Sequence, residues 1–288
     1  MSVLGRCAVY LKPVVERFPP VAKFFRYAWD NWQMFEEPQD TPMGFKFVGH
    51  STMQSGCFEL EETELVKRIL QSVEVVINVG ANIGYYCCFA LKAGLQVVAF
   101  EPVGSNLRYL YKNIKANHWE DRIEIFPMAL TNRTGIIDIF GGGTGASLIK
   151  GWAGTPEYLV DTVPVSTLDN VLGCRFHGQR CFVLVDIEGA ERMMLEGASK
   201  LLSASPKPIW MVEIVVTAHQ PKGVTLNPDL EATFKRFWDH GYEAFTADKH
   251  MRLVSPSEVG NIVATGQNTL ESSNFLFIEK GRNDVLLR

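Results

Sequence analysis

The sequence predicts an α/β fold: a doubly wound, mostly parallel sheet of seven strands, preceded by a helical extension at the N-terminus. Two observations lead to this prediction. Short apolar runs, such as 75–79, 97–100 and 181–187, have the composition of strands that are buried on both faces of a sheet. Segments with helical periodicity alternate with these runs, which implies right-handed crossovers and a parallel sheet. Such sheets bind their ligands at the carboxyl ends of the strands.

The composition fits one large globular domain with a small extension. The chain has 288 residues, 47% of them hydrophobic, and a formal net charge of -4. A chain of this length can bury a substantial core. The slightly acidic balance gives no general electrostatic attraction to nucleic acid, so we expect no nucleic-acid partner.

The cysteines and the N-terminal residues indicate a cytoplasmic protein. The six cysteines show no C-x-x-C spacing, and the adjacent Cys87 and Cys88 fall in an expected helix, where they would pack as small apolar side chains. Charged residues, among them Arg6, Lys12 and Glu16, interrupt the apolar residues at the N-terminus. Neither a secretory signal nor a membrane span is therefore predicted.

The N-terminal extension, which we place at residues 1–50, contains a predicted amphipathic helix. Its apolar side chains recur at helical spacing: Val21, Phe24, Phe25, Ala28, Trp29 and Trp32. The first thirty residues are net positive, which permits peripheral contact with an anionic membrane surface. The same apolar stripe suits a homodimer contact or a helix that covers the main domain. That domain is expected over residues 51–288.

The expected elements of the main domain alternate along the chain. Leu107 begins an apolar i, i+3, i+4, i+7 pattern, typical of a helix packed on one side of a sheet. Asn227-Pro228 begins a later helix, and Gly241 ends it. In chain order we expect a hairpin at 44–58, a helix at 65–70, strands at 75–79 and 97–101 with a helix between them, a helix at 107–114, a strand at 123–128, two strand-like pieces within 135–167, strands at 181–187 and 209–214, a helix at 227–241 and a final strand at 274–279.

The insertion at 135–167 breaks the alternation of strands and helices. Its two strand-like pieces surround a glycine-rich loop at 141–145. Long loops of this kind commonly carry specificity, and we expect a flexible lid. A phosphate-cradling loop is the alternative, although no Gly-Lys-Ser/Thr sequence follows it.

The turn after the strand 75–79 indicates a binding site for an adenosine-containing ligand. Gly80 and Gly84 can adopt backbone angles closed to other residues and, without a Cβ, let a ligand lie against the main chain. Glu101 follows Gly80 by about 20 positions, where its oxygens can accept hydrogen bonds from both ribose hydroxyls. The spacing is G-x-x-x-G, and Asn82 stands where dinucleotide folds keep a bare position for pyrophosphate. This favours a ligand without a pyrophosphate, such as S-adenosylmethionine.

Carboxylates lie at the ends of two later strands. Asp186 and Glu188 fall at the end of the strand 181–187, and Glu213 at the end of the next. Because these ends meet at the ligand edge of the sheet, we expect Asp186 to orient or deprotonate an acceptor hydroxyl. Glu188 and Glu213 would then fix the substrate.

Other interpretations of these residues are open. Glu188 and Glu191 could simply begin a helix, whose dipole favours carboxylates. His219, in a loop soon after Glu213, is an alternative base because histidine side chains titrate near neutrality. It could equally be a solvated loop residue. Asp186, Glu188 and Glu213 could instead hold a divalent cation that acidifies the hydroxyl.

The ordered motifs resemble the FkbM-type methyltransferases, which have the Rossmann-like class I S-adenosylmethionine-dependent methyltransferase fold. The match covers about 56–278 and includes V-G-A-N-I-G-Y-Y at 79–86, A-F-E-P at 99–102, an N-x-x-x-L-x-x-N-like helix at 106–113, M-A-L at 128–130, T-L-D at 167–169, D-I-E-G-A-E at 186–191, V-E-I at 212–214 and N-F-L-F-I at 274–278. The resemblance implies S-adenosylmethionine as cofactor and O-methylation of a sugar, glycan or secondary metabolite. It implies cofactor contacts at Asn78, Gly80, Ala81, Asn82, Gly84, Tyr85, Glu101, Pro102, Asn106, Ala129 and Asp186.

Three positions depart from the family pattern. Asn78 stands where an Asp usually precedes the turn, Leu184 replaces a usual Lys, and Val215 replaces a frequent His. These changes make a catalytically inactive S-adenosylmethionine-binding scaffold one alternative. A nicotinamide-dependent oxidoreductase is another; it would share the turn and Glu101 but should show a third glycine. The acceptor is not predicted, and an amine acceptor is open beside a hydroxyl.

Overall fold

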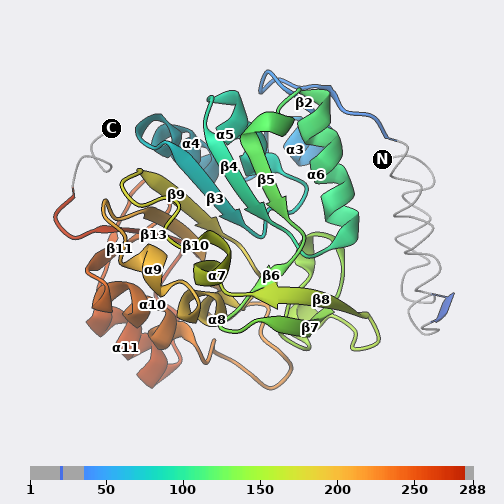
Figure 1. Cartoon of the computed structure of the whole chain (residues 1–288). Helices are drawn as coiled ribbons and strands as arrows, with labels where there is room; N and C mark the ends of the chain where they lie inside the picture. The colour runs from blue at the N-terminus through green and yellow to red at the C-terminus, as the bar shows by residue number, and fades with distance from the viewer. Residues whose placement is uncertain (1–19, 22–35, 283–288) are drawn as a thin grey trace. The chain divides into compact units, whose positions relative to one another are not determined.

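A mixed sheet of eight strands forms the centre of the unit that begins at Pro38 (Figure 1). The computed structural model describes residues 20–21 and 36–282. The strand order is β12-β11-β13-β10-β9-β3-β4-β5. The strands are β3 (Val75–Val79), β4 (Gln96–Phe100), β5 (Ile123–Phe126), β9 (Cys181–Val185), β10 (Ile209–Glu213), β11 (Tyr242–Thr246), β12 (Leu253–Val254) and β13 (Asn274–Glu279).

The strands β10, β9, β3, β4 and β5 pair in parallel, whereas β13 pairs antiparallel with both β10 and β11. This arrangement confirms the predicted doubly wound, mostly parallel α/β fold. The sheet has one strand more than the seven predicted, and neither β11 nor β12 was among the strands expected along the chain. Leu253 and Val254 of β12 form a two-residue antiparallel edge strand on β11. A run that short leaves no periodicity in the sequence.

Helices cover both faces of the sheet and enclose two cores. Val75, Ile77 and Val79 of β3 point into one core, and Val76 points into the other. Side chains alternate between the two faces of a strand, so a strand that lies between two layers of helices must be apolar throughout. One core contains α4 (Leu60–Ile69), α5 (Tyr85–Lys92) and α6 (Gly104–Ala116), and the other α7 (Leu168–Leu172), α8 (Glu191–Glu196), α9 (Ser199–Leu202), α10 (Leu230–Asp239) and α11 (Pro256–Thr265).

The residues before α4 pack onto the core that contains α4, α5 and α6. Strands β1 (Gln39–Asp40) and β2 (Lys46–Phe47) form an antiparallel pair, and the short helix α3 (Ser51–Gln54) follows. Phe45 and Phe47 are buried, and the side-chain amide of Asn113 on α6 bonds the backbone N–H and C=O of Val48 at 2.7 and 3.0 Å. The predicted aromatic helix at 21–32 lies outside the described residues except for Val21. The boundary at residue 50, and any membrane or dimer contact of that helix, stay predictions.

The insertion forms a second, three-stranded sheet in the order β6-β8-β7. Its strands are β6 (Ala129–Leu130), β7 (Gly135–Phe140) and β8 (Val160–Ser166), and β7 pairs antiparallel with β8 as a hairpin. We call the segment between them, residues 141–159, the flap. Phe140 and Ser147 exchange two backbone hydrogen bonds, of 2.8 and 2.9 Å, which close the glycine-rich tip of the flap at its base.

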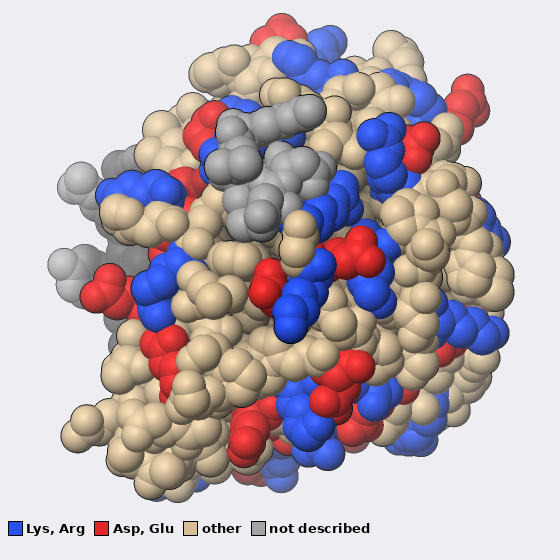
Figure 2. Space-filling view, turned by 90° about the vertical axis from the view of Figure 1, so that its left-hand side faces the viewer, with Lys and Arg blue, Asp and Glu red and all other residues tan. Residues whose placement is uncertain are grey.

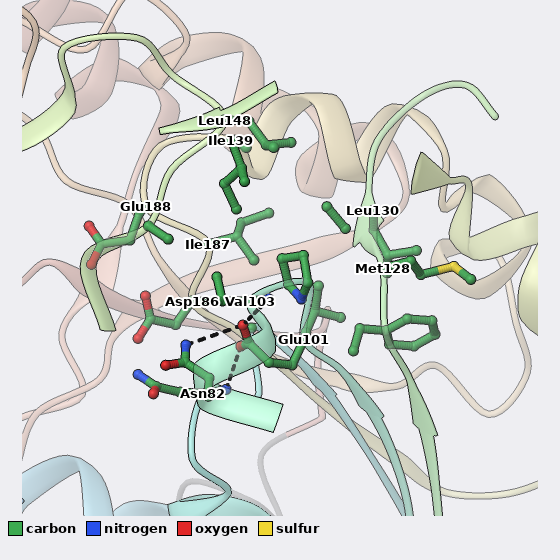
Figure 3. A pocket seen from close by; sticks show the side chains of 18 of the residues that line it. Asn82, Glu101, Val103, Met128, Leu130, Ile139, Leu148, Asp186, Ile187 and Glu188 are labelled. Atoms are coloured by element: carbon green, nitrogen blue, oxygen red, sulfur yellow. Dashed lines mark hydrogen bonds between the residues drawn. The ribbon is translucent and has the colours of Figure 1, made fainter. Parts of the chain in front are cut away.

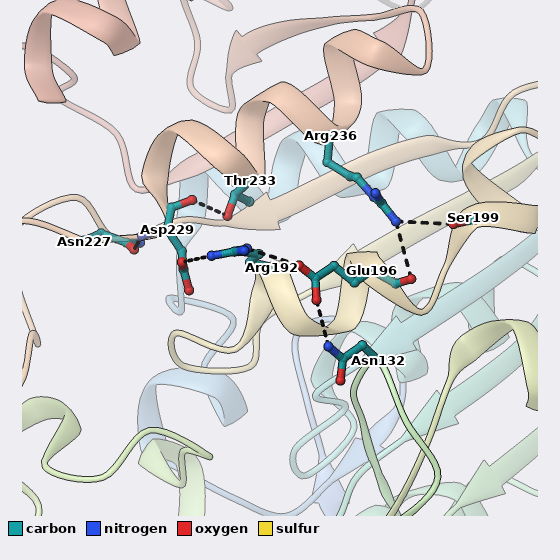
Figure 4. A network of polar contacts seen from close by, with 8 residues as sticks. All are labelled: Asn132, Arg192, Glu196, Ser199, Asn227, Asp229, Thr233 and Arg236. Atoms are coloured by element: carbon teal, nitrogen blue, oxygen red, sulfur yellow. Dashed lines mark hydrogen bonds and ion pairs between the residues drawn. The ribbon is translucent and has the colours of Figure 1, made fainter.

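A polar network at the surface holds α8 against α10 (Figure 4). Arg192 on α8 donates to Asp229 at 2.6 Å and to Glu196 at 3.2 Å. Glu196 also accepts a 2.7 Å bond from Asn132. Exposed pairs of this kind contribute roughly 0.2–1 kcal/mol each. Their position matters more than their strength, because α8 begins directly after the loop that carries Asp186 and Glu188.

The charged side chains do not separate by sign on the face drawn in Figure 2, where basic and acidic groups are interspersed. This distribution agrees with the small formal net charge of -4. Among residues 20–21 and 36–282, no helix combines the length and apolarity that a membrane crossing requires. The cytoplasmic location stays a prediction.

Candidate active site

A pocket opens at the carboxyl ends of β3, β4 and β9, the sheet edge at which the sequence predicts a ligand (Figure 3). Residues from the flap also contribute to its wall. The polar side consists of Asn82, Glu101, Asp186 and Glu188, and the apolar side of Met128, Leu130, Ile139 and Leu148. An apolar end combined with a few convergent polar groups is the usual form of a small-molecule site.

The two glycines of the turn are required by packing within the protein. Gly80 has a φ of +82°, and a Cβ on it would collide with the backbone carbonyl of Asp186. Gly84 has a φ of +91°, and a Cβ there would collide with the Leu110 side chain. We expected the absent side chains to make room for a ligand. Instead the carbonyl of Asp186, directly after β9, takes that space at Gly80, and Leu110 of α6 takes it at Gly84. Gly80 nevertheless lines the pocket.

Glu101 is buried and is already hydrogen-bonded by its own loops. Its side chain is 3% exposed. Oε2 accepts from the backbone N–H of Asn82 at 2.7 Å, and Oε1 accepts from the N–H of Val103 at 2.8 Å and from Nδ2 of Asn106 at 3.2 Å. A carboxylate offers about four acceptor positions, so about one is left for a ligand, where the sequence suggested two. Burial raises the pKa of Glu101 to about 7, and the three hydrogen bonds oppose that rise.

Asn82 contributes an unsatisfied acceptor to the pocket. Its backbone is left-handed, with a φ of 51°, a conformation that Asn tolerates better than most residues. Its Oδ1 is buried and has no hydrogen-bond partner within the described chain. Such an atom costs roughly 1–3 kcal/mol if it stays unpaired. We therefore expect a ligand or a water molecule to donate to it.

Asp186 and Glu213 form a coupled pair of carboxyl groups at the ends of β9 and β10, linked by a side-chain hydrogen bond. Asp186 is an exposed residue at the edge of the sheet. Desolvation by the groups packed around its carboxyl, together with the negative charges of Glu213 and Glu188, raises the pKa of Asp186 well above its ordinary value. Burial raises the pKa of Glu213 to about 7, although the hydrogen bond from Asp186 opposes this. Two adjacent carboxyl groups do not readily ionise together, so the pair holds one proton near neutral pH.

Glu188 is held by the flap. Its backbone is left-handed, with a φ of 54°. Its Oε2 accepts from the indole Nε1 of Trp152 at 2.6 Å, and its backbone oxygen accepts from Ser147 Oγ at 2.5 Å. The Trp152 ring lies so close to Gly189 that a Cβ there would be 2.6 Å from it. The residue predicted to fix the substrate is thus also the attachment point of the flap.

Glu191 has a different role from Glu188. It is the first residue of α8, is 3% exposed, and its Oε1 accepts from the backbone N–H of Gly189 at 2.9 Å. Burial raises its pKa to about 8. The alternative that both carboxylates merely begin a helix therefore describes Glu191, whereas Glu188 lies in the loop before α8.

His219 lies beside the flap, outside the residues that line the pocket. Its ring makes an edge contact with Trp152, with centroids 6.1 Å apart, and its backbone oxygen accepts from the N–H of Ala153 at 2.6 Å. This geometry gives no support to its predicted role as a base. A structural role for the His219 loop in seating the flap fits these contacts better.

The other predicted cofactor contacts divide into two groups. Pro102, Asn106 and Ala129 line the pocket. Asn78, Ala81, Gly84 and Tyr85 are not among its lining residues. Asn78 is 1% exposed in the core behind the turn; its Nδ2 donates to Cys87 Sγ at 3.4 Å, and its Oδ1 has no partner. Tyr85 packs in an aromatic cluster with Phe47, Phe58 and Phe89. These side chains shape the turn from behind.

Glu59 and Tyr86 form a polar contact that was not predicted and that lies outside the residues lining the pocket. The Tyr86 hydroxyl donates to Glu59 Oε2 at 2.7 Å. The negative charge of Glu59 is the smallest contribution to the raised pKa of Asp186 and of Glu213. Tyr86 ends the glycine-turn motif and could have been noticed. Glu59 lies 27 positions before it, and no spacing rule connects the two.

No metal centre is formed by the part of the chain that the structure describes. Over residues 20–21 and 36–282, no group of three His, Cys, Asp or Glu side chains has an arrangement that could hold an ion. The divalent-cation alternative at Asp186, Glu188 and Glu213 thus gains no support from the geometry.

Comparison with known proteins assigns the chain to a family. The profile described as "Methyltransferase FkbM domain" matches residues 78–244, more than half of the chain. A search of curated proteins gave no match. Two of the similar solved structures are an O-methyltransferase from Bacillus cereus in complex with SAH (13% identity, TM-score 0.40, covering 76% of this chain and 80% of that one) and a precorrin-6y C5,15-methyltransferase from Geobacter metallireducens (10% identity, TM-score 0.37, covering 69% and 78%). These likenesses are distant, and the family assignment rests on the profile.

Proposed function

The chain belongs to the FkbM methyltransferase family, and on that premise we propose that it transfers the methyl group of S-adenosylmethionine to a hydroxyl of a small-molecule or glycan acceptor. The observation that carries the proposal is the layout of the pocket. Glu101 lies between an apolar side and Asp186, whose carboxyl group is hydrogen-bonded to that of Glu213, a residue outside the pocket lining. One pocket thus offers a place for an adenosine next to a proton acceptor.

The residues of the pocket fit S-adenosylmethionine. The apolar side, with Met128 and Leu148 among its residues, suits an adenine ring. Glu101 has about one acceptor position left for a ribose hydroxyl. The unpaired Oδ1 of Asn82 can accept a bond from a ligand hydroxyl or ammonium group.

When bound, S-adenosylmethionine supplies a methyl group that is already electrophilic because it is attached to a positively charged sulfur. The protein then has to align the acceptor oxygen and exclude water, and alignment of this kind is worth roughly 7–11 kcal/mol. The flap covers part of the pocket with Leu148 and its neighbours. Asp186 and Glu213 take up the proton that the acceptor hydroxyl loses, a contribution of roughly 10²–10⁴-fold.

The carboxyl pair favours a hydroxyl over an amine as acceptor. A hydroxyl is a poor nucleophile until a base removes its proton, whereas a neutral amine already has a free electron pair. Family membership and the lack of a third glycine in the turn favour methyl transfer over a nicotinamide-dependent oxidation. The inactive-scaffold alternative has a specific basis, because Leu184 and Val215 place buried aliphatic groups where the family often has Lys and His.

Calorimetric titration of S-adenosylhomocysteine, combined with an assay of its formation from S-adenosylmethionine, tests the proposal. We expect binding, and turnover with at least one member of a panel of sugars, glycans and hydroxylated metabolites. Asp186→Asn should reduce turnover by roughly 10²–10⁴-fold while the affinity for S-adenosylhomocysteine changes by less than about threefold. Asp239→Asn, on the exposed end of α10, is the matched control. Binding without turnover of any acceptor supports the scaffold, and binding of a nicotinamide cofactor instead supports the oxidoreductase.

A further inference from the structure

Asn106 connects two parts of the pocket through a single amino group. It lies in the first turn of α6 and is 5% exposed. Its Nδ2 donates to Glu101 Oε1 at 3.2 Å and to the backbone oxygen of Gly143, in the flap, at 3.0 Å. A side-chain amide carries two N–H bonds, so both are committed, one to each partner.

The tip of the flap has little else to fix it. A Cβ at Gly142, Gly143 or Gly145 would meet no atom within 4 Å, so this stretch lies in open surroundings. Gly143 and Thr144 nevertheless line the same pocket as Glu101. The position of the tip over the pocket therefore depends strongly on the bond from Asn106.

The middle of the flap is anchored more firmly than its tip. Trp152 is 2% exposed and donates to Glu188, and Ser147 donates to the backbone oxygen of the same residue. The stretch from Ser147 to Trp152 is thus the fixed base of the flap, and one amide holds the tip. A segment fixed in this way can open at the tip while its base stays in place.

We propose that Asn106 is a positioning residue that couples occupation of the Glu101 side of the pocket by the methyl donor to closure of the flap tip. The inference rests on the proposed function. A ribose hydroxyl that bonds Glu101 keeps the carboxylate charged, which strengthens its hydrogen bond from Asn106. The amide is then held with its second N–H directed at Gly143. Coupling is reciprocal, so closure of the tip must raise the affinity for the ligand by the same factor.

Hydrogen exchange of the backbone amides of residues 141–145 reads this coupling directly, because these residues form the tip of the flap. The experiment uses the full chain, with exchange followed by mass spectrometry and S-adenosylhomocysteine as the probe. We expect saturating probe to slow this exchange at least fivefold in the wild type. In Asn106→Ala the probe should bind about tenfold more weakly and, at saturation, slow the exchange by less than twofold. Asn170→Ala, an exposed residue of α7, is the control and should behave like the wild type.

The possible outcomes distinguish a failure of the proposed coupling from a failure of the proposed function. Equal protection in Asn106→Ala and the wild type overturns the coupling, as does an unprotected wild type that binds the probe. A wild type that does not bind the probe overturns the proposed function and this inference with it. If Asn106→Ala exchanges rapidly throughout the chain, Asn106→Leu keeps the size of the side chain and removes the donor without adding a charge beside Glu101. Exchange of residues 141–145 then gives the same comparison in that variant.

Discussion

The indole Nε1 of Trp152 donates a 2.6 Å hydrogen bond to Oε2 of Glu188, and this bond attaches the flap to the loop that follows β9. The same loop carries Asp186, two residues earlier in the chain. The flap and the candidate proton acceptor are therefore mechanically connected. A substitution that removes this hydrogen bond should therefore lower catalytic activity more than it lowers the stability of the fold.

Trp152→Phe tests that connection. The phenyl ring keeps much of the packing on Gly189 but loses the N–H group, so the Glu188 carboxylate loses a hydrogen bond worth roughly 1.5–3 kcal/mol. We expect kcat/KM to fall by roughly tenfold or more, with a smaller effect on the affinity for S-adenosylhomocysteine. Trp238→Phe, on α10, controls for the loss of an indole elsewhere. Unchanged kcat/KM in Trp152→Phe would show that the bond has no part in turnover.

Glu101→Gln tests the ribose carboxylate. Both oxygens of Glu101 accept from N–H groups, so a Gln amide must direct an N–H at another donor and leave a backbone N–H unpaired. We expect the affinity for S-adenosylhomocysteine to fall at least tenfold and the free energy of unfolding to fall by about 1–3 kcal/mol. Glu231→Gln, exposed on α10, is the control for both measurements. Wild-type affinity in Glu101→Gln would remove Glu101 from the binding site.

The coupled carboxyl pair predicts a pH dependence of turnover. The pair must be able to accept a proton, and the pKa of Glu213 is raised to about 7. We therefore expect kcat/KM to rise with pH toward neutrality and to level off above about pH 7. Glu213→Gln removes a negative charge beside Asp186, which lowers the pKa of Asp186. The rise at about pH 7 should then disappear or move to another pH, because the group with that pKa has been removed. A profile that does not move in the variant contradicts the pair as the proton acceptor.

Glu191 predicts a pH dependence of stability. Its pKa is about 8 in the folded protein against an ordinary value of 4.5, so between these values the folded state binds more protons than the unfolded state. Its contribution to stability is complete below about pH 4.5 and is lost as the pH rises through about 8, at up to about 1.4 kcal/mol per pH unit. Glu191→Gln cannot titrate and keeps an acceptor for the N–H of Gly189. Urea unfolding from pH 5 to 8 should show a shallower loss of stability in this variant, and an unaltered slope refutes the assignment.

The central part of the fold was predictable because it leaves a strong sequence signal. Strands β3, β4, β9 and β10 lie between two layers of helices, so almost every residue in them is apolar. The glycine turn, Glu101 and Asp186 follow from these strands, since strand ends define the ligand edge of a parallel sheet. Strands β11 and β12 were not among the expected strands, and the two residues of β12 show no periodicity.

The contacts that complete the site were not predictable from spacing. Glu59 meets Tyr86, and Trp152 meets Glu188, only because separate loops converge on the same edge of the sheet. The packing around Gly80 and Gly84 was not predictable for a related reason. A sequence shows that a Cβ is absent, but only the folded chain shows that Asp186 and Leu110 take its place.

The most direct test of the account is a crystal structure of the protein with S-adenosylhomocysteine. We predict that a ribose hydroxyl of the ligand lies about 2.5–3.0 Å from the Glu101 carboxylate. The adenine should lie against Met128 and Leu148, and the sulfur should face Asp186. A ligand bound elsewhere, or one whose ribose does not touch Glu101, contradicts the proposed function.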